Sequence, residues 1–170
     1  MALGNNELTQ EQLRKDLWYN YETGHFTWIK HPQAKRIGTR AGDLTASNYR
    51  YIMIAGKKHK EHRLAFLYHY GCFPVDDLVV DHIDADRSNN TFWNLRLCTP
   101  EQNKRNVGRS CRNTSGYKGV SYNKPTGKWK AKIQCDGVDH YLGLYETPEQ
   151  AHKAYVKLGK ELHGEFFNAG

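Results

Sequence analysis

Four polar side chains near the middle of the sequence have residue types that together suit metal-assisted hydrolysis. Asp81 and His82 are adjacent, and Asn94 and Asn103 follow them within a short stretch of chain. Carboxylate and amide oxygens are hard ligands that suit a cation such as Mg²⁺, which binds few protein groups and keeps several of its waters. A neutral imidazole beside such a cation can accept a proton from water. The second asparagine can orient this imidazole through a hydrogen bond.

The surrounding sequence predicts the elements that must hold these side chains. The apolar residues 79–80 predict a short strand that delivers Asp81 and His82, and a second strand is expected to open at Asn94. The run Thr99-Pro100-Glu101-Gln102 combines a capping threonine, a proline in the first turn and a glutamine that completes a capping box. A helix carrying Asn103 is therefore expected to follow the second strand.

This arrangement resembles the ββα-metal motif of the HNH nucleases, in the variant whose last histidine is replaced by asparagine, as in phage intron-encoded nicking homing endonucleases. The resemblance covers about residues 61–106. It implies that Asp81 and Asn103 hold one Mg²⁺ or Mn²⁺ ion beside the scissile phosphate. It also implies that His82 activates the attacking water and that Asn94 positions His82.

Each of these residues, taken alone, has an ordinary structural explanation. An Asp-His pair at a strand end often forms a turn or a cap, and single asparagines are common on surfaces. The active-site interpretation is favoured because residue types, spacing and expected elements agree. Four other polar residues are expected to shape the loop and not to join the site, because Asp and Asn bond their own backbone in turns. They are Asp84, Asp86, Asn89 and Asn90.

Length, charge and cysteine spacing restrict the class of protein. The chain has 170 residues and a net charge of +7, which allows one domain or two small ones and favours an anionic partner. No apolar run approaches the length of a membrane span and no signal peptide is visible, so we expect a cytoplasmic protein with no membrane partner. The four scattered cysteines, without a Cys-x-x-Cys pair, are expected to be reduced thiols.

The region before the motif predicts a small α+β extension behind a loose tail at residues 1–6. A capping box at Thr9 opens a short helix that includes Leu13 and Leu17, and residues 25–29 alternate as a strand. Residues 32–43 are expected to form a basic loop.

A strand at residues 49–54 is expected to turn into a basic return strand, and residues 63–68 predict a helix that ends at Gly71 and Pro74. His62 stands at the start of this helix. We expect it to cap or pack, with a contact to phosphate as the alternative.

The composition changes after Asn103. Between Lys104 and Lys132 there is no acidic residue and no histidine, and residues 107–115 are predicted to form an extended basic linker. Such a segment would follow a phosphate backbone well, although a merely solvated segment is the alternative. The candidate DNA contacts here are Lys104, Arg105, Arg109 and Arg112.

The last part of the chain predicts three antiparallel strands and a helix. The strands are expected at residues 117–122, 128–134 and 139–145, separated by turns, and Thr147 is expected to cap the helix. In the second strand three lysines alternate with Trp129, Ala131 and Ile133, so one face packs and the other is positive. Trp129 is therefore expected in the core.

This part of the chain resembles the DNA-binding domain of plant ethylene response factors (AP-two type), which also occurs as an appendage of phage HNH endonucleases. The resemblance covers about residues 113–168, and the residues that carry it are Tyr117-Lys118-Gly119-Val120, Gly127-Lys128-Trp129, Leu142-Gly143-Leu144-Tyr145, Glu149-Gln150-Ala151, Ala154-Tyr155 and Gly164-Glu165-Phe166-Phe167-Asn168.

The resemblance implies that the sheet lies in the major groove of DNA. The chain departs from the family at residues 121–125, where the plant proteins place base-reading arginines, so base preference cannot be transferred. The candidate DNA contacts in this part are Lys118, Ser121, Tyr122, Asn123, Lys128, Lys130, Lys132 and Tyr141.

Together these patterns predict an α+β protein with a nuclease domain at residues 1–106, a linker at 107–115 and a DNA-binding domain at 116–170. The favoured function is a site-specific endonuclease of homing or nicking type. It would act as a monomer on double-stranded DNA, with one metal ion per site and His82 as general base. One alternative is a non-catalytic DNA-binding regulator with a decayed nuclease fold. Another is a nonspecific degradative nuclease, for which the last domain would be hard to explain.

Overall fold

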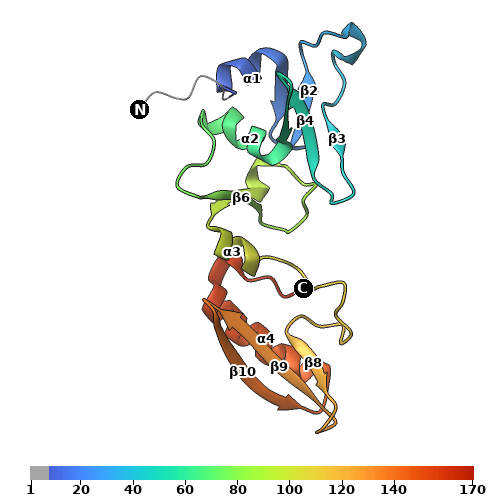
Figure 1. Ribbon diagram of the computed structural model, residues 1–170, viewed down its shortest axis with the longest axis vertical. Coiled ribbons are helices and arrows are strands. Elements are labelled where there is room, and N and C mark those ends of the chain that lie inside the picture. The colour runs from blue at the N-terminus through green and yellow to red at the C-terminus, as the bar shows by residue number, and fades with distance from the viewer. Residues whose placement is uncertain (1–7) are drawn as a thin grey trace. The chain divides into compact units, whose positions relative to one another are not determined.

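The computed structural model describes residues 8–170 (Figure 1). The chain forms two compact units, and the boundary between them in the sequence lies between Cys98 and Thr99. The tail expected at residues 1–6 lies outside the described residues. Both units combine helices with antiparallel strands, as the sequence predicted. All four cysteines are free thiols. Among the helices of residues 8–170, none has the length and apolar character that crossing a bilayer requires.

Over its described residues, 8–98, the first unit contains two helices, three small antiparallel sheets and two short 3₁₀ turns, at residues 34–36 and 92–94. Strands β1 and β2 pair, β4 lies between β3 and β5, and β6 pairs with β7. The bounds of these elements are α1 Gln10–Asp16, β1 Leu17–Asn20, β2 His25–Trp28, β3 Asp43–Leu44, β4 Arg50–Ile54, β5 Lys57–Lys60, α2 Glu61–Tyr70, β6 Val79–His82 and β7 Leu95–Cys98.

The core of the first unit lies where α1 and α2 pack together against its strands. Leu13 of α1, Phe26 of β2 and Leu64 of α2 are fully buried in one cluster. The capping box at Thr9 is confirmed. Leu17 was expected in the first helix, but the helix ends one residue earlier, because Leu17 adopts extended backbone and reaches the core as the first residue of β1.

The second unit is a three-stranded sheet covered by a long helix, preceded by a short one. Its strands lie in the order β10, β9, β8, and α4 packs on them around the small buried residues Ala131 and Ala151 (Figure 1). Trp129 packs against this core, as predicted. The bounds are α3 Pro100–Arg105, β8 Val120–Asn123, β9 Lys128–Cys135, β10 Val138–Tyr145 and α4 Pro148–His163, followed by a 3₁₀ turn at residues 164–166.

The segment expected to be an extended linker is bound into the second unit. The side-chain amide of Asn168 donates to the carbonyl of Asn106 at 2.9 Å. The ammonium of Lys118 donates to the carbonyls of Val107 at 2.5 Å and Asn168 at 2.8 Å. The division of the chain therefore falls before α3 and not at residue 106, because these contacts join α3 and the following coil to the sheet and helix.

Candidate active site

Asp81 and His82 are the last two residues of β6, and the β6–β7 hairpin fixes both. Asp81 pairs with Arg96 and His82 pairs with Leu95 in the antiparallel register. Both residues are buried, with 6% and 4% of their surface exposed. The hairpin continues for one more residue, since the N–H of Ile83 donates to the carbonyl of Asn94 at 2.8 Å.

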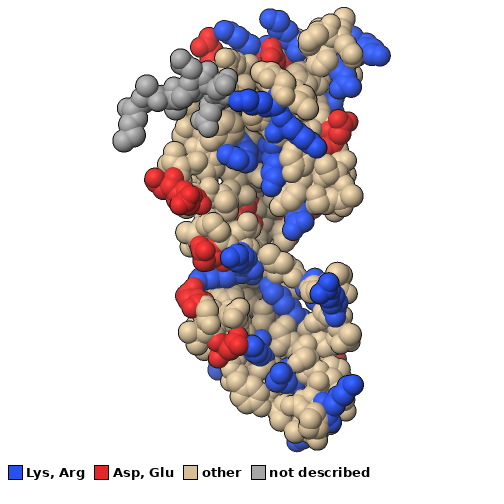
Figure 2. Space-filling view, in the orientation of Figure 1, with Lys and Arg blue, Asp and Glu red and all other residues tan. Residues whose placement is uncertain are grey.

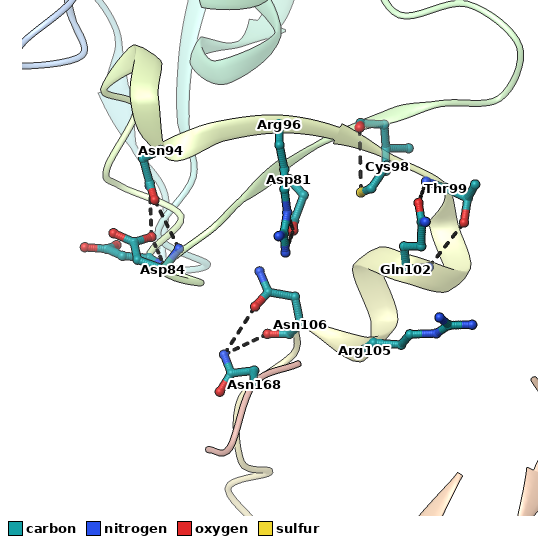
Figure 3. A network of polar contacts seen from close by, with 12 residues as sticks. Asp81, Asp84, Asn94, Arg96, Cys98, Thr99, Gln102, Arg105, Asn106 and Asn168 are labelled. Carbon is teal, nitrogen blue, oxygen red and sulfur yellow. Dashed lines mark hydrogen bonds and ion pairs between the residues drawn. The ribbon is translucent and has the colours of Figure 1, made fainter. Parts of the chain in front are cut away.

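Arg96 is bonded to the carboxylate of Asp81 across the hairpin (Figure 3). Both Nε and Nη2 of Arg96 lie 3.1 Å from Oδ2 of Asp81. A guanidinium in this position gives a nearly buried carboxylate a hydrogen-bonding partner of opposite charge and fixes its direction, because an isolated charge there would be costly. Arg96 was not among the site residues expected from the sequence, although its place opposite Asp81 follows from the hairpin register.

His82 is held by a buried amide. Nε2 of His82 lies 2.9 Å from Oδ1 of Asn90, and Asn90 is 1% exposed. Nδ2 of Asn90 donates to Oε2 of Glu61 at 2.6 Å. Glu61, the first residue of α2, is fully buried and lies 3.7 and 3.8 Å from the guanidinium groups of Arg40 and Arg50. Glu61 and Asn90 thus form a buried polar chain that ends on the imidazole, with Arg50 and the exposed Arg40 at its outer end.

Burial keeps the imidazole of His82 uncharged. It lowers the pKa of His82 below its ordinary value of 6.5, and the opposing effects of the hydrogen bond to Asn90 and of the Asp81 carboxylate are smaller. His62 packs edge-on against it, with ring centroids 4.9 Å apart, and burial lowers the pKa of His62 to about 3. A neutral His82 at pH 7 can accept a proton. For His62, burial and ring contacts agree with the expected packing role.

Asn94 was expected to position His82, but its side chain bonds to the loop (Figure 3). Its Nδ2 donates to Oδ1 of Asp84 at 2.9 Å and to the carbonyl of Asn89 at 2.8 Å, and its Oδ1 accepts from the N–H of Asp84 at 3.1 Å. Asn90, expected to shape the loop, takes the place at the imidazole. The reason is geometric: Asn94 faces the turn that follows β6, whereas Asn90 is turned inward against α2.

The fourth expected residue, Asn103, lies on α3 in the second unit. The capping box of this helix at Thr99 and Gln102 is present as predicted. Among residues 8–170, no three His, Cys, Asp or Glu side chains gather in a way that could hold a metal ion. A cation at Asp81 would therefore depend on carboxylate, amide and water oxygens. This donor chemistry fits a Mg²⁺ or Mn²⁺ ion that keeps several waters.

Several of the basic residues expected to contact DNA have partners inside the second unit. Lys118 donates to three backbone carbonyls and its pKa is lowered by burial, so it has a structural role instead. Arg105 forms an ion pair with Asp136, and Arg109 donates to the carbonyl of Gly116. Lys104 and Arg112 are exposed.

The lysines of β9 share one face of the sheet with other expected contacts. Ser121 pairs with Lys130, Asn123 with Lys128, and Tyr141 with Lys132. Tyr122 does not share this face, because it pairs with Trp129 and contacts its ring, with centroids 5.1 Å apart.

Acidic side chains partly offset the charge of the lysine face. Lys128 is 2.6 Å from Glu146, and Lys132 is 2.6 Å from Asp139. Figure 2 shows that basic and acidic side chains both occur on the side of the molecule in view. The lysine face is thus basic, but two of its three lysines lie beside a carboxylate.

Comparison with known proteins identifies the class. Residues 59–105 match the model of the HNH endonuclease family. The chain is 34% identical over 87 residues to "Protein 3.8" of Escherichia phage T7, which covers 51% of this chain and 71% of that protein. It is 41% identical over 90 residues to "Uncharacterized HNH endonuclease L560" of Acanthamoeba polyphaga mimivirus, covering 53% of this chain. The chain spans just under half of the mimivirus relative, 46% of its length. The chain belongs to the HNH endonuclease family.

Two further proteins are similar to this chain, one in sequence and one in structure. It is 32% identical over 95 residues to "Ethylene-responsive transcription factor ERF069" of Arabidopsis thaliana, covering 53% of this chain and 57% of that one. A solved structure described as "DNA binding and cleavage by the HNH homing endonuclease I-HmuI" aligns over 87% of this chain and 85% of the other. The TM-score is 0.42 at 21% identity, which is too low to transfer residues.

Proposed function

We propose that this chain is a DNA endonuclease that hydrolyses a phosphodiester bond at a single metal centre, with His82 as general base. The observation that carries the proposal is the state of His82. Its imidazole is buried, neutral at pH 7, bonded to Asn90 through Nε2 and adjacent to Asp81 at the end of β6. An uncharged, oriented imidazole can act as the base that abstracts a proton from water.

In this proposal Asp81 would hold the divalent ion together with amide and water oxygens, and the ion would offset negative charge developing on the phosphate. The assignment of Asn103 as the amide ligand remains a prediction from the sequence. The remaining work is done by the chain. Arg96 fixes the direction of the Asp81 carboxylate through two hydrogen bonds. His82 takes the proton of the attacking water. Asn94 holds the loop after β6, so that the hairpin keeps its shape around the imidazole.

We further propose that the second unit chooses the site on double-stranded DNA through the lysine face of its sheet. The residues of this face are Ser121, Asn123, Lys128, Lys130, Lys132 and Tyr141. Phosphate contacts from lysines would supply salt-dependent affinity, and side chains in the groove would supply sequence preference. A monomer with one metal centre is expected to nick one strand.

The test is cleavage of a supercoiled plasmid with Mg²⁺ or with EDTA. The wild-type protein is expected to nick at a discrete position only with the metal. His82→Ala is expected to lower the cleavage rate by about a hundredfold or more, while binding to the same duplex is unchanged. His31→Ala, in the loop after β2, is the matched control and is expected to cleave normally.

Three outcomes would contradict parts of this proposal. Unchanged cleavage by His82→Ala would exclude His82 as the base. Site-specific binding without cleavage under any metal would favour the regulator with a decayed nuclease fold. Digestion to small fragments would favour a nonspecific nuclease and leave the lysine face without its proposed role.

A further inference from the structure

We infer that Glu61 is a positioning residue for His82: through Asn90, its buried carboxylate fixes the proton of the imidazole on Nε2 and leaves the lone pair on Nδ1. This inference deepens the proposed function and rests on it for its consequence in catalysis. The residues involved are Glu61 at the start of α2, Asn90 in the loop after β6, and His82.

The acceptors around Asn90 determine which way its amide points. One end of the amide lies 2.6 Å from Oε2 of Glu61 and 3.5 Å from the carbonyl of Ser88. Carboxylate and carbonyl oxygens only accept hydrogen bonds, so this end must be the NH₂ group. Burial raises the pKa of Glu61, while the guanidinium groups of Arg40 and Arg50 and the hydrogen bond from Asn90 oppose this rise. The carbonyl of Ser88 can only accept, whatever the protonation state of Glu61, so it identifies the NH₂ end independently. The other end of the amide, which faces His82, is therefore the oxygen.

The direction of the amide then sets the tautomer of His82. An amide oxygen has no proton to give, so the contact of 2.9 Å between Oδ1 of Asn90 and Nε2 of His82 requires an N–H on the imidazole. In a neutral ring the second nitrogen, Nδ1, must then carry the lone pair. Only this tautomer presents a base at Nδ1, whereas the other tautomer would present a proton there.

The backbone around Asn90 is held as firmly as its side chain. The hydroxyl of Tyr19 donates to the carbonyl of Asn90 at 2.6 Å, and Gly24 packs directly on the same peptide. Because these contacts restrain the peptide, we expect a change at Glu61 to be absorbed mainly by rotation of the amide. Glu61 is fully buried, where an ionised carboxylate needs partners to remain. Its contacts fit a residue whose charge is used to orient Asn90.

The direct test is the proton position in the full-length, metal-free protein at one fixed pH. Long-range ¹⁵N–¹H NMR spectra distinguish the two ring nitrogens of a neutral histidine, and the His82 signals are assigned by their loss in His82→Ala. The wild-type protein is expected to show the proton on Nε2. A proton on Nδ1 of His82 would overturn the inference without any variant having to fold.

Glu61→Gln tests the role of the charge with little change of shape. Its amide can donate as well as accept, so Asn90 is free to turn its NH₂ group toward His82 and the Nδ1–H tautomer is expected to appear. The cleavage rate at saturating DNA is expected to fall about tenfold to a hundredfold, as for other residues that orient a site residue, with unchanged DNA affinity. Glu22→Gln, in the exposed turn after β1, is the control and is expected to match the wild type.

A double-mutant comparison separates positioning from simple destabilisation. If Glu61 acts through Asn90, Glu61→Gln is expected to have no further effect on the cleavage rate once Asn90 is replaced by leucine. A wild-type tautomer and full cleavage rate in Glu61→Gln would overturn the inference while leaving His82 as the base. The expected tautomer change in a protein that never cleaves DNA would instead reject the proposed function and leave the inference standing.

Discussion

His62 and His82 lie ring against ring in the interior of the first unit, and both are favoured in the uncharged form. Burial is the main cause for each, and the charge of one would further disfavour the charge of the other. In the unfolded chain, His62 binds a proton when the pH falls below its ordinary pKa of 6.5. In the folded protein, its pKa is lowered to about 3, so it stays neutral until the pH approaches that value. The contribution of His62 to stability is therefore complete above pH 6.5 and is lost as the pH falls toward 3.

We predict that His62→Phe makes stability less dependent on pH. Because of His62 alone, the free energy of unfolding of the wild-type protein should fall by about 1.4 kcal/mol per pH unit between pH 6.5 and 5. The phenyl ring has no proton to bind and can keep the contact with Tyr49, whose ring centroid lies 5.4 Å from that of His62. Urea denaturation at pH 7 and pH 5 measures the difference. An equal loss in both proteins would show that another group carries the pH dependence.

At the level of elements, the β1–β2 hairpin supports the loop that carries Asn90. Gly24, in the turn of this hairpin, has φ +70° and packs so closely that a Cβ there would lie 2.2 Å from the carbonyl carbon of Asn90. Tyr19 of β1 bonds to the same residue. Two neighbouring strands thus hold a loop that is far away in sequence.

Gly24→Ala is predicted to damage both stability and cleavage. Gly56→Ala is the matched control, because Gly56 has φ +73° but nothing within 4 Å of the added methyl group. Both variants carry the backbone strain, and Gly24→Ala should cost about 1–3 kcal/mol more because it also overpacks the contact with Asn90. Thermal denaturation and the cleavage rate measure the two effects. Equal behaviour of the variants would show that the loop does not depend on this contact.

At the level of the whole molecule, the net charge of +7 gives a poor guide to which cations contact DNA. Lys118 lies in the basic stretch but is bonded to backbone carbonyls of the second unit. Lys130, on the lysine face, pairs with Ser121 of the neighbouring strand and lies between two lysines that have acidic partners.

Lys118→Met and Lys130→Met are predicted to affect different properties, protein stability for Lys118→Met and DNA binding for Lys130→Met. Lys118→Met should destabilise the second unit by about 1–3 kcal/mol, because three backbone carbonyls lose the donor that joins them. Lys130→Met should leave stability unchanged and weaken DNA binding. The slope of log K for DNA binding against log salt concentration should become smaller in magnitude by about one. Denaturation and binding at several salt concentrations measure these changes. If Lys130→Met bound DNA like the wild type at every salt concentration, the lysine face would not be the DNA-binding surface.

The sequence by itself determined the features that depend on neighbours along the chain. The capping boxes at Thr9 and Thr99, the Gly71 helix end and the hairpin that delivers Asp81 and His82 are formed within a few residues of each other. Local hydrogen bonding and side-chain alternation fix such features whatever the rest of the fold does. Their residue types were therefore enough to predict them.

Only the tertiary structure decided which polar groups meet. Nothing in the residue types separates Asn90 from Asn94 as the partner of His82, and the choice is made by Glu61, 29 residues away from Asn90. Lys118 likewise became structural through Asn168, 50 residues away. A buried donor or acceptor must find a partner wherever packing places one, and that partner is set by the approach of distant elements, which no local pattern encodes.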